Sequence, residues 1–215
     1  MNKNLLKNKM RKHYVLFAAA LVAGLWTVPA SAAEQYLSGN VGMTWLNDIP
    51  DGSSRFVLDD GTGLLVAVGL DNKHQDYRFE GEVGYQTSGI SSRTNGFGST
   101  DYRGNVHVWS LMANGYYDIY STNEGFRPYL TAGAGAVRVK FDDLRYAGAS
   151  QGSGNSEHES AFAYQIGAGV AFPITPDMKF DARYRFFSTA DFRLDDGYKT
   201  HFSSSSFLIG LRFRL

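Results

Sequence analysis

The chain has 215 residues, with 21 basic and 21 acidic side chains and no cysteine. Its length fits one domain, and its balanced charge gives no basic surplus of the kind that nucleic-acid partners require. The absence of cysteine from the sequence excludes a disulfide framework and a lipid-attachment thiol.

Residues 1–32 are typical of a cleaved secretory signal. Five basic residues and no acidic residue precede an apolar run from Tyr14 to Trp26, and Ala30-Ser31-Ala32 provides the small residues of a cleavage site. The run is too short for a membrane anchor, because a bilayer core of ~30 Å needs about 20 helical residues. We therefore expect cleavage after Ala32 and a mature domain over residues 33–215, in which 16 bases stand against 21 acids. This mildly acidic balance argues against nucleic acid as a partner.

Alternation of apolar and polar residues recurs through the mature domain. Between Leu37 and Trp45, for example, apolar side chains occupy odd positions and small or polar ones the even positions. Successive side chains of a strand point to opposite faces, so the pattern predicts strands, and no mature stretch has the ~18 apolar residues of a membrane helix. Eight strands are expected, over residues 35–46, 62–70, 77–87, 105–117, 128–141, 161–172, 178–187 and 204–215.

The connections between these strands alternate in length. Those at 71–76, 118–127 and 173–177 are short, whereas the others are longer and rich in Gly, Ser, Asn and Asp, the third being 142–160. Short turns at one rim and long loops at the other are typical of bacterial outer-membrane barrels, whose closure leaves no unpaired edge in lipid. We therefore predict an all-β fold, an eight-stranded antiparallel transmembrane β-barrel with short periplasmic turns and long extracellular loops.

A secreted β-sandwich would show similar alternation. Aromatic residues near the ends of the predicted strands favour the barrel, because girdles of aromatic side chains mark the two membrane interfaces. The residues expected in these girdles are Tyr36, Trp45, Tyr85, Tyr116, Tyr117, Tyr129, Phe141, Phe162, Phe172 and Phe213.

The last strand defines which face meets lipid. One face is wholly apolar and the other carries Arg212 and Arg214, which we expect in the lumen or at the periplasmic rim. An arginine facing lipid costs about 2 to 4 kcal/mol at the midplane and about 0 to 1 near an interface. The residues expected to face lipid are Phe207, Ile209, Leu211, Phe213 and Leu215.

Alternation also predicts an ionic network inside the barrel. Its expected members are Arg78, Glu80, Glu82, Asp181, Arg183, Arg185 and Arg212. The strands at 77–87 and 178–187 are opposite in an eight-stranded cylinder, whose interior is just wide enough for side chains to fill. We expect Glu80 and Glu82 to pair with the arginines at 183, 185 or 212 and to plug the lumen.

A hydrated passage lined by ions is the alternative to a plug. Arg138, Lys140 and Arg214 are also expected to point inward, which would give seven inward bases against three acids. Such a surplus would call for water or for acidic loop residues to balance it.

Three stretches and the closing strand resemble a known family. They are SLMANGYYDIY (110–120), RPYLTAGAGAVRVKF (127–141) and FAYQIGAGVAFPITPDMKFDARYRFF (162–187). They resemble the small outer-membrane β-barrel family of opacity-type and OmpA-like transmembrane domains. The resemblance implies a structural or adhesin-like surface protein of the outer membrane, without catalysis or cofactor. It also implies contact with outer-membrane lipid and lipopolysaccharide, the barrel assembly machinery, and host or environmental ligands at the loops.

Two further functions stay open from the sequence. One is a narrow porin-like channel, for which the Gly and Ala residues of the fifth and sixth strands would leave room. The other is a lipid A acyl hydrolase, since His201 and Ser203 are expected on one strand face; no orienting acid accompanies them, so we predict no catalytic residue. Glu157-His158-Glu159 could suggest a metal, yet adjacent acids in a loop are more typical of solvated surface, and no metal site is predicted.

Overall fold

The computed structural model describes most of the mature domain. The described residues are 33–47, 49–51, 54–72, 76–95, 98–119, 125–146, 157–193 and 199–215. The predicted signal and its cleavage site lie outside them. No helix in this part of the chain is long and apolar enough to span a membrane.

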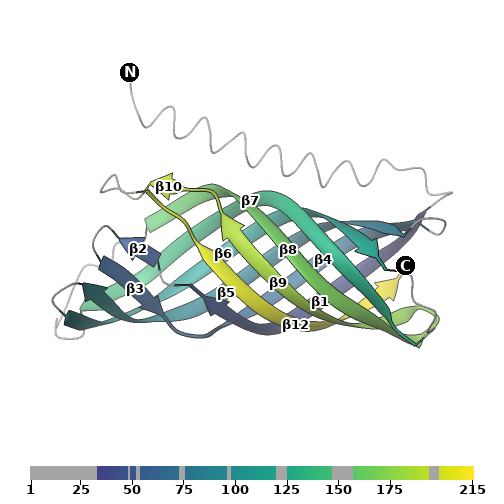
Figure 1. The fold of residues 1–215 in the computed structure, drawn as a ribbon, viewed down its shortest axis with the longest axis horizontal. Helices are drawn as coiled ribbons and strands as arrows, with labels where there is room; N and C mark the ends of the chain where they lie inside the picture. Colours follow the sequence, from purple (N-terminus) through teal and green to yellow (C-terminus); the bar gives the residue numbers. More distant parts are fainter. Residues whose placement is uncertain are drawn as a thin grey trace, which may run out of the picture.

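Eight long strands form a closed antiparallel barrel, which confirms the predicted fold class (Figure 1). The strands are β1 (Ala33–Leu46), β4 (Gly61–Asn72), β5 (Tyr77–Asn95), β6 (Gly98–Asp118), β7 (Arg127–Tyr146), β8 (Glu157–Thr175), β9 (Met178–Thr189) and β12 (Ser203–Arg214). Each pairs with its neighbours along the chain, and β1 pairs with β12 from Leu46↔Ser204 to Tyr36↔Arg214. This last pairing closes the cylinder, so no barrel strand keeps an open edge.

The two ends of the barrel differ. At one, called the turn end, β8 and β9 are joined through residues 176–177, and the last residue of the chain is tied down. The Arg214 amide donates to the Asp177 carbonyl oxygen, and the Leu215 amide donates to that of Gln35. The opposite end, called the loop end, carries the connections after β1, β5, β7 and β9; the one after β5 is only residues 96–97, whereas the other three are longer.

Much of the predicted loop sequence at the loop end is strand. β5 and β6 stay paired up to Asn95↔Gly98, and β7 and β8 take in residues 141–146 and 157–160. The predicted connection 142–160 is therefore shorter than expected. A strand with water on both faces needs no alternation, so its sequence resembles that of a loop.

Smaller strands extend this ladder on one side. The hairpin of β2 (Ile49–Asp51) and β3 (Ser54–Leu58) adds to β5, while β10 (Phe192–Arg193) pairs only with β11 (Lys199–Thr200). We call β2, β3 and the loop-end parts of β5 to β8 the wall. Figure 1 shows the β2–β3 hairpin at the end of the barrel away from the C terminus.

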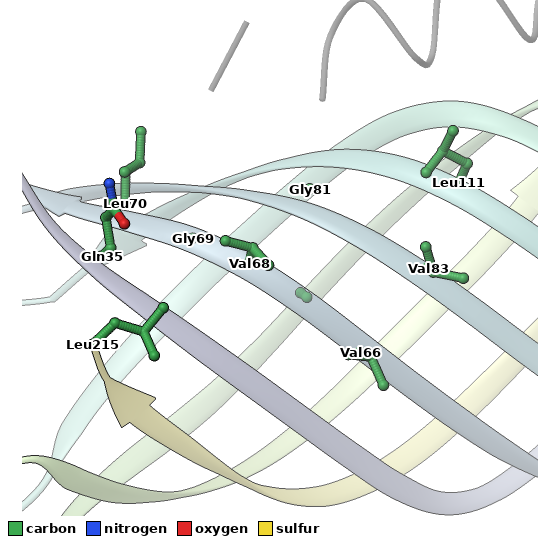
Figure 2. A pocket seen from close by; sticks show the side chains of 10 residues that line it. Gln35, Val66, Val68, Gly69, Leu70, Gly81, Val83, Leu111 and Leu215 are labelled. Carbon is green, nitrogen blue, oxygen red and sulfur yellow. The ribbon is translucent and has the colours of Figure 1, made fainter. Parts of the chain in front are cut away.

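The exterior of the barrel is apolar. Outward side chains such as Val41, Ile166 and Phe79 are exposed, as a surface in contact with lipid requires. A shallow groove of about 300 Å³ crosses this surface where Gly81 lacks a side chain, and Figure 2 shows Val83 of β5 beside it. Its lining is almost wholly apolar, so we assign it to the lipid-contacting exterior.

Candidate functional site

The structure brings the predicted lumen charges together inside the barrel. All seven are buried, with at most 6 % of each residue exposed. Glu82 of β5 is central, since its carboxylate lies 3.5 Å from Arg183 Nη2 and 3.6 Å from Arg185 Nη1, both from β9. Asn114 Nδ2 and Gln165 Nε2 also donate to it, each at 3.2 Å. A buried carboxylate with this many donors stays compensated without water.

Glu80 has partners other than the arginines expected for it. Its carboxylate lies 3.7 Å from Arg78 Nη1 of its own strand, and it accepts from the hydroxyls of Tyr36 at 2.8 Å and Tyr116 at 2.5 Å. The Tyr116 hydroxyl also accepts from Arg183 Nη1 at 2.6 Å. Tyr116 therefore links the two glutamates of β5 into one network.

Two further ion pairs lie nearer the turn end. Arg78 donates to Asp118 through Nε at 2.9 Å and Nη2 at 3.0 Å, and its guanidinium stacks on Tyr116 with 4.2 Å to the ring centre. Asp181 accepts from Arg212 Nη2 at 3.0 Å and from the Tyr129 hydroxyl at 2.6 Å. Sequence reasoning missed Asp118, because it closes β6, where alternation ends.

Three tyrosines expected in the membrane girdles are inside the lumen instead. Tyr36, Tyr116 and Tyr129 are at most 3 % exposed, whereas the neighbouring Tyr117 points outward and is 44 % exposed. Proximity to a strand end was a poor guide, since consecutive side chains face opposite sides. The position of Tyr36 next to outward Leu37 was the signal that could have placed it correctly.

The expected surplus of inward bases is wrong. On β7 the odd positions Val137 and Val139 are buried, so Arg138 and Lys140 face outward. Arg214 lies exposed at the turn end, where it pairs with Glu34 and with Asp177. The buried ion pairs of the described lumen join four arginines to four carboxylates. Balanced charge favours a closed network over a cationic passage.

An apolar plug fills the lumen at the loop end. It consists of Leu46, Ile90, Val106, Val108, Met112, Val137, Val139, Ala161, Ala163, Phe187 and Phe202. The rings of Phe187 and Phe202 are fully buried, with their centres 6.2 Å apart. Ions do not cross a dry apolar constriction, because nothing there replaces their hydration.

The closing strand has the expected orientation. The five apolar residues Phe207, Ile209, Leu211, Phe213 and Leu215 are 36 to 74 % exposed on the exterior. Arg212 lies on the opposite face, inside the lumen. Figure 2 shows Leu215 at the edge of the exterior groove, next to Gln35 of β1.

The residues considered for catalysis or metal binding are not assembled. Ser203 is buried and its hydroxyl accepts from Asn47 Nδ2 at 2.8 Å, whereas His201 is exposed and precedes β12. The two are therefore not on one face of a strand. Residues 157–159 begin β8 and are not part of a loop. The described residues contain no cluster of three or more His, Cys, Asp or Glu that could hold a metal.

Comparison with known proteins agrees with this geometry. The model of the outer membrane protein beta-barrel domain matches residues 18–213. The outer membrane protein PagN of Salmonella typhimurium is 24 % identical, over 95 % of this chain and 99 % of its own. Two solved structures share the fold. Neisserial surface protein A has a TM-score of 0.57 at 16 % identity, covering 84 % of this chain and 97 % of its own. OprG of Pseudomonas aeruginosa has a TM-score of 0.52 at 14 % identity, covering 86 % of this chain and 97 % of its own.

Proposed function

Since the chain belongs to the family of outer membrane protein beta-barrel domains, we propose that it is a non-catalytic surface protein whose wall binds a macromolecule outside the cell. The protein is an integral β-barrel of a Gram-negative outer membrane. In such barrels the short turns face the periplasm and the long connections face outward. The turn end is then periplasmic, and the wall is extracellular.

The observation that carries the proposal is the wall itself. The pairing of β5 with β6 runs on from the barrel to Asn95↔Gly98, and β3 adds to the same sheet along residues 90–94 of β5. A hydrogen-bonded ladder fixes these residues before any ligand arrives, which lowers the ordering cost of binding. Binding residues are commonly carried at such strand connections on a rigid scaffold.

In this proposal the barrel does not conduct, and its role is to hold the wall at the outer surface of the membrane. The apolar plug supports closure, so the narrow channel is the weaker alternative. The apolar exterior contacts outer-membrane lipid. The finer partners are lipopolysaccharide at that exterior, the barrel assembly machinery during insertion, and host or environmental ligands at the wall.

A deletion of the β2–β3 hairpin tests the binding role of the wall. Residues 49–58 are replaced by a short Gly-Ser turn, and the control variant receives the same turn in place of residues 73–75, which connect β4 to β5. Cells displaying each protein are measured for binding to epithelial cells and extracellular matrix. We expect binding to fall at least tenfold for the hairpin deletion only. Equal binding by both variants, or no binding by the parent above cells without the protein, would contradict the proposal.

Two measurements test the remaining parts. Overexpression should leave the mass spectrum of lipid A unchanged, and a loss of acyl chains would overturn the non-catalytic assignment. Purified protein in a planar bilayer should give no discrete conductance steps. Regular conductance steps would show that the plug opens and that the protein is a channel.

A further inference from the structure

A charged pocket of about 70 Å³ lies at the turn end of the barrel. Several of its charges are compensated by neighbours. Arg214 pairs with Glu34 and with Asp177, and Arg212 pairs with Asp181 of the lumen. The charged residues that line the pocket are Glu34, Asp71, Asp177, Lys179, Arg212 and Arg214.

Two residues of this lining, Lys179 and Asp71, are not paired. Their side chains form no ion pair or hydrogen bond within the described part of the chain, although Asp71 attracts Lys179 electrostatically. They come from β9 and β4, which β1 and β12 separate. Lys179 is directly opposite Arg212 in the ladder, and like charges at such positions repel. Arg212 is 6 % exposed, and its Nε has no hydrogen-bond partner. One side of the pocket therefore offers donors to an anion, and the other side offers a carboxylate to a cation.

The apolar groove on the exterior ends at the same rim. Gln35 lines both the groove and the charged pocket. Figure 2 shows Gln35 and Leu215 at one end of the groove and Leu111 at the other. The groove follows residues 66–70 of β4 for roughly 13 Å, enough for part of an acyl chain.

The two parts lie at different depths in the membrane. The rings of Tyr77 and Tyr117 point outward at the turn end, with their centres 5.3 Å apart, and mark the periplasmic interface. Asp71 of the pocket is in register with the residue after Tyr77, so the pocket is level with the headgroups. Val66 of the groove is in register with Val83, six residues past Tyr77, so the groove reaches into the hydrocarbon.

A phospholipid with both charges in its headgroup fits the pocket and the groove together. Its phosphate accepts charge-assisted hydrogen bonds from Lys179 and Arg212, its ammonium lies against Asp71, and one acyl chain lies in the groove. Three bases and three acids line the pocket, which argues against a ligand that is only an anion. We propose that the charged pocket and the groove bind a zwitterionic phospholipid of the inner leaflet, of the phosphatidylethanolamine type. The inference goes beyond the proposed function and rests only on the orientation given there.

The test compares phosphatidylethanolamine with phosphatidylglycerol, whose headgroup has the phosphate but no ammonium. Folded protein in an uncharged detergent is titrated with each lipid, both with myristoyl chains, and complexes are counted by native mass spectrometry. Free phosphoethanolamine is the competitor. The variant K179Q removes the cation, D71N removes the carboxylate and G81L fills the groove. The matched control R138Q removes an exposed cation from the exterior of β7. The heat-dependent shift on a gel shows that each variant is folded.

The parent should bind phosphatidylethanolamine about tenfold more tightly than phosphatidylglycerol, because only the first lipid uses Asp71. K179Q should weaken both lipids about tenfold, the loss of one charge-assisted hydrogen bond. D71N should weaken phosphatidylethanolamine alone. G81L should weaken both lipids, and R138Q should change neither. Free phosphoethanolamine at the same concentration should displace neither lipid.

Equal affinity of the parent and K179Q for phosphatidylethanolamine, or equal effects of D71N on the two lipids, would overturn the pocket as the headgroup site. Unchanged binding by G81L, or full displacement by free phosphoethanolamine, would overturn the groove as the acyl-chain site. Cell binding through the wall is measured on K179Q as well and should equal that of the parent. Failure of the lipid site is thereby distinguished from failure of the wall.

Discussion

Glu82→Gln is the sharpest test of the lumen network, because it removes one charge while keeping the side chain's shape. Glu82 faces Arg183 and Arg185 at 3.5 and 3.6 Å. At an effective dielectric constant of about 20, each such pair contributes about 5 kcal/mol of Coulomb energy. Part of this lost Coulomb energy is offset, because a neutral glutamine amide costs less free energy to bury than a charged carboxylate. Breaking a buried pair from one side therefore costs about 3 to 5 kcal/mol.

The loss should fall mainly on Arg185. Arg183 keeps its hydrogen bond to the Tyr116 hydroxyl at 2.6 Å. Arg185 keeps a 3.4 Å contact with Gln165 Oε1 and a position 5.5 Å from the centre of the Phe187 ring, but its Nε and Nη2 have no hydrogen-bond partner. A second substitution, Arg185→Met, removes that uncompensated charge. The double variant should then be less destabilised than the sum of the two single variants by about 1 to 3 kcal/mol.

The assay is urea unfolding of the protein inserted in lipid vesicles. With a denaturant dependence of about 2 kcal/mol per molar, Glu82→Gln should lower the unfolding midpoint by about 2 M. The matched control is Asp177→Asn, which breaks an exposed ion pair with Arg214 and should cost less than about 1 kcal/mol. Equal unfolding midpoints for Glu82→Gln and Asp177→Asn would refute the network. Strictly additive effects of Glu82→Gln and Arg185→Met in the double variant would also refute it.

Three further outcomes are expected. Tyr129→Phe leaves buried Asp181 without one donor and should lower the free energy of unfolding by about 1 to 3 kcal/mol in the same urea titration. Phe202→Ala empties part of the apolar plug and should cost about 3 to 5 kcal/mol; an unchanged midpoint would show that the plug is not tightly packed. Gly210→Ala should reduce the heat-modifiable folded fraction on a gel, because its Cβ would meet the Gly39 carbonyl oxygen, whereas Gly39→Ala meets nothing and should fold normally.

Alternation predicted the parts of the structure where one face is apolar. Outward Val83 fixes Glu82 as inward, and outward Tyr184 does the same for Arg183 and Arg185. The register of a strand with one lipid-facing side is strongly specified, since a slip by one residue would exchange the two faces. The orientation of the buried charges therefore followed from their neighbours.

The alternation of apolar and polar residues did not predict the remaining features of the site, and the reason differs from one feature to the next. Tyr116 and Tyr117 are adjacent aromatics, and only their parity within β6 separates a lumen residue from a girdle residue. Arg138 and Lys140 were predicted to point inward, but burial of Val137 and Val139 sets the opposite parity on β7. The wall has no alternation to detect. Partner choice within the lumen, such as Glu80 with Arg78, depends on side-chain directions that spacing does not give.

The β1–β12 seam determines how this protein can be made. Thr44 and Ser206, which share a hydrogen bond across it, are 162 positions apart, so almost the whole polypeptide must be present before the ring can shut. Contacts this distant carry the greatest entropic penalty and form slowly. Until they form, the first and last strands expose a row of unsatisfied amides that hydrocarbon does not tolerate. We therefore expect the barrel to close in one cooperative step, and a protein that lacks β12 to have no stable membrane-inserted form.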